Sequence, residues 1–132
     1  MKIKDALVLL LLEALVVIGV ISLFQMLDRQ IAGLLGGFLF GLLGIFIGYR
    51  LVRKANYMMT FTFWWLFIYL FYSVLPMLYT RLSHWGVDFT QLKVWGMVGP
   101  EFHFVSEKIY AILILATCLD LSVALFKKFR RV

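Results

Sequence analysis

The 132-residue chain is 64% hydrophobic and 15% charged, a composition too apolar for a soluble domain. Its net charge of +6 does not indicate nucleic-acid binding, because the cations stand at the ends of long apolar runs, as in membrane proteins. The single Cys118 lies inside an apolar run and has no partner for an intrachain disulfide. We therefore expect one integral membrane domain over residues 1–132.

The apolar runs predict an all-α membrane protein with four transmembrane helices. A helix that crosses a bilayer needs about 20 apolar residues, and each run approaches or exceeds that length. The first run is longer than the 7–15 apolar residues typical of a signal peptide, so we interpret it as a retained span. Pro76 should kink the third span, because proline removes a backbone hydrogen bond. The predicted spans are about 6–27, 31–52, 57–80 and 106–126.

The second span carries a stripe of glycines on one face. At 100° per residue, the five positions fall within roughly an 80° arc. Glycine destabilises a helix by about 0.5–1 kcal/mol, so a stripe of them indicates a surface that another helix approaches closely. Packing within the chain and self-association both fit this pattern. The residues of this predicted helix-packing interface are Gly33, Gly37, Gly41, Gly44 and Gly48.

The segment of about 81–99 is the only sizeable predicted loop. Asp88 followed by Gln91 is typical of a helix start, and Gly96 is a suitable helix end. Together with nearby aromatic residues, this pattern predicts a short interfacial helix at the headgroup level. The sequence Gly99-Pro100-Glu101 then predicts the start of the fourth helix.

The charges predict the orientation in the membrane. Nine cations flank the ends of the spans on one side and four lie on the other. Because cytoplasmic segments carry the excess of Lys and Arg, we expect both termini to lie in the cytoplasm. We expect the membrane to be a plasma or inner membrane. The basic tail, 127–131, should contact anionic lipid headgroups.

Two acids, Glu13 and Asp120, lie inside predicted spans at nearly the same depth. Acids in lipid are costly and mark either a function or an interhelical bond. They could form a protonatable pair along an ion path, or be held by hydroxyl groups that fix helix packing. A third possibility is that Glu13 reaches towards Lys or Arg at the cytoplasmic face. The intramembrane polar candidates are Glu13, Asp120, Thr62, Tyr69, Tyr72 and Thr117.

Outside the membrane, the sequence places imidazole and carboxylate groups at helical spacing. His84 with Asp88 and His103 with Glu107 are i, i+4 pairs, and Glu101 lies nearby. The four paired residues could bind a metal only if the loop folds back, so we predict no metal site and keep this as the alternative. No phosphate-binding glycine loop, nucleophile elbow or zinc-protease motif is present. We accordingly predict no cofactor and no catalytic residue.

These patterns favour a non-catalytic subunit or assembly factor of a larger membrane complex. It would dock through the glycine face of the second span and through the loop of about 81–99, which we call the outer loop. Its partner would be another membrane subunit or a second copy of the chain. One alternative is a homo-oligomeric ion or solute transporter that uses Glu13 and Asp120. Another is a lipid-active enzyme whose site consists of histidine and carboxylate side chains on the outer face of the membrane.

Overall fold

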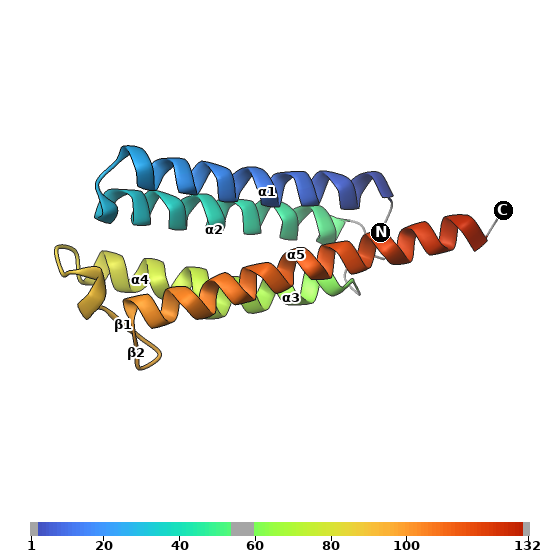
Figure 1. Ribbon diagram of the computed structural model, residues 1–132. Coiled ribbons are helices and arrows are strands. Elements are labelled where there is room, and N and C mark those ends of the chain that lie inside the picture. Colours follow the sequence, from blue (N-terminus) through green and yellow to red (C-terminus); the bar gives the residue numbers. More distant parts are fainter. Residues whose placement is uncertain (1–2, 54–59, 131–132) are drawn as a thin grey trace.

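The computed structural model describes residues 3–53 and 60–130. In this part of the chain, four helical segments are long and apolar enough to cross a membrane, as predicted. Two are α1 (Ile3–Met26) and α2 (Arg29–Arg53), and the last is α5 (Gly99–Arg130). The third comprises α3 (Phe61–Tyr69), the π-helical η2 (Leu70–Val74) and α4 (Leu75–Ser83) (Figure 1). The predicted start of the third span at residue 57, and Lys2, Lys54 and Arg131, lie outside the described residues.

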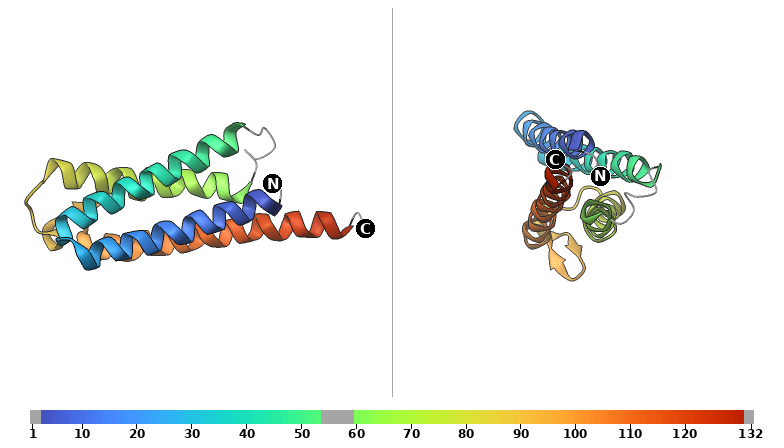
Figure 2. Two further views of the ribbon diagram at one scale, coloured as in Figure 1. Left: turned by 90° about the horizontal axis from the view of Figure 1, so that it is seen from above. Right: turned by 90° about the vertical axis from the view of Figure 1, so that its right-hand side faces the viewer.

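The four segments form a bundle in which α1 contacts α2 and α5, while the third segment contacts α2 and α5 (Figure 2). Its core consists mainly of Leu, Ile, Phe and Tyr side chains, with Leu9, Ile47, Leu66 and Leu113 among the most deeply buried. Both termini lie at one end of the bundle, and the loop after α4 lies at the other (Figure 1). The last turns of α5 extend beyond the other helices (Figure 2). The side of the membrane that each end faces stays a prediction.

The glycine stripe of α2 packs against the third segment of the same chain. A Cβ built on Gly37 would lie 2.6 Å from Leu78 Cδ2, and one on Gly44 would overlap the Leu70 side chain. The five glycines thus form a groove that receives one ridge of the antiparallel neighbour. In order from Gly33 to Gly48, the groove meets Arg81, Leu78, Val74, Leu70 and Leu66. Of the two interpretations of the stripe, the structure shows packing within the chain.

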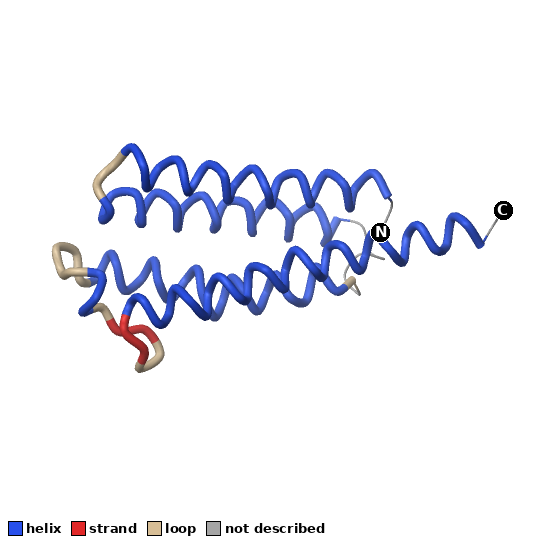
Figure 3. The backbone as a smooth tube through the Cα atoms, viewed as in Figure 1, coloured by secondary structure: helices blue, strands red, loops and turns tan. Residues whose placement is uncertain are grey.

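The prediction of an interfacial helix near 88–96 was wrong. Residues Phe89–Gln91 form one 3-10 turn, η3, and the chain then makes a hairpin of β1 (Lys93–Val94) and β2 (Met97–Val98) (Figure 3). Trp95 and Gly96 both have positive φ, at 56° and 78°. Two such residues between short strands make the tight turn that fits the twist of a β-hairpin. Gly96 therefore supplies a turn, not a helix end.

Pro76 does disturb the third segment, and the hairpin compensates for it. Proline has no N–H to donate to the carbonyl of Tyr72, four residues earlier. The helix widens into the π-helical turn η2 just before Pro76, and the Trp95 indole Nε1 donates to the Tyr72 carbonyl at 3.0 Å. The Trp95 ring also stacks on the Tyr72 ring, with centroids 5.8 Å apart. One tryptophan thus satisfies the exposed carbonyl and anchors the hairpin to the bundle.

The groove predicts which glycines tolerate a side chain. We expect Gly44→Ile to lower the stability of the bundle by about 1–3 kcal/mol, because Leu70 must move out of a packed interface. Thermal unfolding in detergent measures the effect. The matched control is Gly19→Ile in α1, where nothing lies within 4 Å of an added Cβ. Equal losses at the two positions would contradict the groove.

Candidate functional site

Glu13 of α1 is the most deeply buried acid of the described chain, with 0% of its surface exposed. The Thr117 hydroxyl of α5 donates to Glu13 Oε1 at 2.8 Å, and the Tyr110 hydroxyl donates to the Glu13 backbone carbonyl at 2.5 Å. Among the described residues, Glu13 Oε2 is buried without a hydrogen-bond partner. Glu13 is therefore tied to α5 through one side-chain oxygen and its own backbone.

Asp120 of α5 binds the N-terminus of α3. Its Oδ1 accepts from the backbone N–H of Phe61 at 3.1 Å, and its Oδ2 accepts from the N–H of Thr62 at 2.8 Å. The first N–H groups of a helix have no partner within the helix, and the helix dipole favours an anion there. Thr60 adds the usual cap within the segment, since its hydroxyl accepts from Phe63 N–H at 3.3 Å. Asp120 thus caps a neighbouring helix in the bundle.

Two threonines connect the two acids. The Thr62 hydroxyl lies 2.5 Å from Asp120 Oδ2 and 3.3 Å from the Thr117 hydroxyl, which in turn contacts Glu13. All four side chains are buried. This row of Glu13, Thr117, Thr62 and Asp120, the polar seam, joins α1, α5 and α3 across the bundle. The chemistry available there is hydrogen bonding between helices and the binding of a proton by a carboxylate.

Tyr69 and Tyr72, the remaining intramembrane candidates, have other surroundings. Tyr69 packs in the core, with its ring centroid 5.2 Å from that of Tyr110 and 6.0 Å from that of Phe40. Tyr72 lies near the outer loop against Trp95. The structure therefore brings four of the six candidates together and places these two outside the polar seam.

The outer-loop candidates remain apart, except for one pair. His103 Nε2 lies 2.9 Å from Glu107 Oε1 on the exposed surface of α5. His84 and Asp88 are exposed in the loop after α4, where Asp88 Oδ1 accepts from Thr90 N–H at 3.3 Å, and Glu101 is exposed in the first turn of α5. Within residues 3–53 and 60–130, no three His, Cys, Asp or Glu side chains gather as metal ligands would. The fold-back that a four-ligand site requires is not formed.

Several contacts escaped the reasoning from sequence. Tyr110 reaches the Glu13 backbone, the Trp65 indole donates to the Ile109 carbonyl at 2.7 Å, and the Ser73 and Ser106 hydroxyls pair between the third segment and α5. All three link residues that lie far apart in the chain. A hydroxyl or indole group inside an apolar run needs a hydrogen-bond partner within the protein. The partner itself depends on the rotation of both helices.

Comparisons with protein-family models, with curated proteins and with solved structures found no match for this chain.

The cap on α3 predicts how Asp120 variants behave. Asp120→Leu should destabilise the bundle by about 1–3 kcal/mol for each of the two backbone amides that it leaves unsatisfied. Asp120→Asn keeps one acceptor oxygen and should lose less. Chemical unfolding in detergent ranks the variants. Ser122→Ala, two residues further along α5, is the control, because the exposed Ser122 hydroxyl donates to the Cys118 carbonyl of its own helix. An Asp120→Leu variant as stable as this control would contradict the cap.

Proposed function

We propose that this chain is a non-catalytic subunit or assembly factor of a larger membrane complex, which contacts its partner through the outer loop. The observation that carries the proposal is the construction of that loop. Its hairpin is fixed to the bundle by the bond from Trp95 to Tyr72, yet 63% of the Trp95 surface is exposed. Trp85 and Val87 of the same loop are also exposed. A fixed, exposed aromatic surface is typical of sites that bind another protein.

The interior of the bundle supports this role. The polar seam holds three helices together, and the glycine groove is filled by the third segment. Because the third segment already packs along the glycines, we propose that the partner docks at the outer loop and not at the glycine face. We propose that the partner is another membrane subunit.

The position in the membrane follows the charge distribution. We propose that both termini lie in the cytoplasm, that the membrane is a plasma or inner membrane and that the outer loop lies at the opposite headgroup level, where Trp is favoured. Lys127, Lys128 and Arg130 in the last turn of α5 would then contact anionic headgroups.

Site-specific photo-crosslinking tests the docking surface. A photo-reactive amino acid in place of Val87 should give one discrete protein adduct in native membranes, to be identified by mass spectrometry. The same probe at Ile18, which is exposed at mid-span in α1, should react with lipid alone. Trp95→Ala should remove the adduct at position 87 while the helix content stays unchanged. A monomer with no adduct at position 87, or equal protein adducts at both positions, would contradict the proposal.

Glu13 favours a second function, transport of protons or a small ion. A buried carboxyl group with one unbonded oxygen is expensive in lipid, and such groups commonly serve ion pathways.

Flux measurements separate the two functions. If the chain transports protons, then in vesicles with a pH gradient the wild type should conduct and Glu13→Gln should not, because an amide does not titrate near neutral pH. Glu13→Gln should stay folded, since its side-chain oxygen can still accept from Thr117. Our leading proposal expects no flux above that of empty vesicles for either protein.

A further inference from the structure

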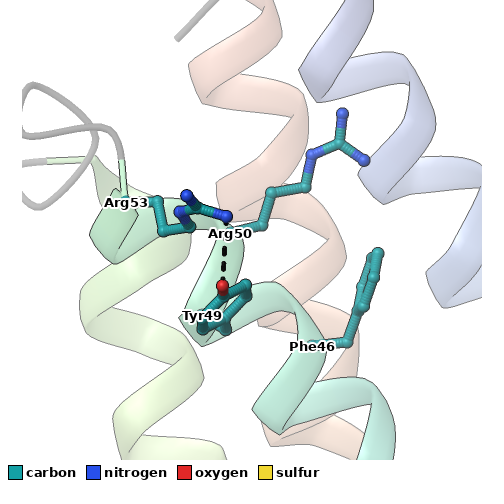
Figure 4. A pocket seen from close by; sticks show the side chains of 4 residues that line it. All are labelled: Phe46, Tyr49, Arg50 and Arg53. Carbon is teal, nitrogen blue, oxygen red and sulfur yellow. Dashed lines mark hydrogen bonds between the residues drawn. The ribbon is translucent and has the colours of Figure 1, made fainter.

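We infer that the hollow at the end of α2 binds the phosphate group of an anionic phospholipid. Phe46, Tyr49, Arg50 and Arg53 line this open hollow, which has a volume of about 400 Å³ (Figure 4). It lies on α2, and is therefore a different site from the basic end of α5. The inference does not depend on the outer loop or on Glu13.

Both arginines are held by neighbouring side chains. Arg50 Nη2 lies 3.3 Å from Asp5 Oδ1 of α1, and the Asp5 side chain is only 9% exposed. Arg53 Nη1 donates to the Tyr49 hydroxyl at 3.1 Å, and its guanidinium carbon lies 5.5 Å from the centroid of the Tyr49 ring. Each hydrogen bond uses one of the five N–H donors that a guanidinium group carries. The planar groups are thus oriented while retaining donors for phosphate oxygens, which arginine binds in a bidentate manner.

The charge around the hollow suits a single phosphodiester. Among the described residues that line the hollow or bond to its lining, Arg50 and Arg53 contribute two positive charges and Asp5 one negative charge, an excess of one positive charge. A phosphodiester carries one negative charge and would balance it. A divalent cation would face two arginines and is disfavoured.

The apolar lining favours a lipid over free phosphate. Phe46 precedes Arg50 by one helical turn, so it lies deeper along the span than the arginines. Phe46 and Tyr49 are both exposed. The candidate membrane span of α2 is Gln30–Arg50, so in a bilayer the guanidinium groups would lie near its end, at the level of the lipid phosphates. A ligand with a phosphate at the membrane surface and an apolar glycerol ester deeper in the membrane matches the order of the arginines and Phe46 along α2.

The test titrates the full chain in neutral detergent with a short-chain phosphatidylglycerol and follows the unfolding temperature. Phosphatidylcholine and inorganic phosphate are added in parallel. The wild type should be stabilised by phosphatidylglycerol at concentrations where the other two have little effect. Arg53→Gln should raise the half-saturating concentration about fivefold, the effect expected for one cation at a membrane surface.

The control variant is Lys108→Gln, which removes an exposed positive charge from the first half of α5, far from the hollow. It should change the half-saturating concentration less than twofold. Arg53→Lys keeps the charge without the planar guanidinium group. Its half-saturating concentration should lie between those of the wild type and Arg53→Gln, and it serves as the test variant if Arg53→Gln does not fold. Equal effects of Arg53→Gln and Lys108→Gln would overturn the site in favour of diffuse charge. Stabilisation by inorganic phosphate equal to that by phosphatidylglycerol would overturn the lipid as ligand.

Discussion

The structure depends most on hydrogen-bond acceptors for the free amides at the start of α3, because hydrocarbon offers no water to pair with them. Asp120 meets that need from α5 with both carboxylate oxygens. The same carboxylate binds the Thr62 hydroxyl, which leads through Thr117 to Glu13 of α1. A single need for hydrogen-bond acceptors thus brings three helices to one depth.

Near Pro76 the third segment needs a hydrogen-bond donor and not an acceptor. There a carbonyl lacks a donor because of Pro76, and an indole N–H provides one. The group that supplies it belongs to the hairpin, whose turn requires positive φ at Trp95. That unusual backbone conformation is stabilised by the hydrogen bond and the ring stacking that it permits. Loop and helix are therefore specified together, and neither pattern can be understood from its own residues alone.

The sequence predicted the helices well because their signal is long and repeated: four apolar runs, and glycines that return to one face. It also identified Glu13, Asp120, Thr62 and Thr117, since polar side chains stand out in an apolar run. Local patterns failed where two structures share the same signals. Asp88, Gln91 and Gly96 suit a short helix as well as a 3-10 turn with a hairpin, and only the long-range contact of Trp95 distinguishes them. Likewise, Asp120 and the amides that it caps lie about 58 residues apart, a separation that no local periodicity reveals.

The two groups that complete the backbone pairing of the third segment, Trp95 and Asp120, both follow it in the chain. During synthesis the third segment therefore emerges with unpaired amides near its start and an unpaired carbonyl near Pro76. The helix pair of α1 and α2, by contrast, already presents the glycine groove in which this segment will lie. The glycine groove can thus hold the segment by shape before the hydrogen bonds from α5 become available. In this order of events, α5 acts as the closing element, and the bundle becomes a finished structure only when the last quarter of the chain has been made.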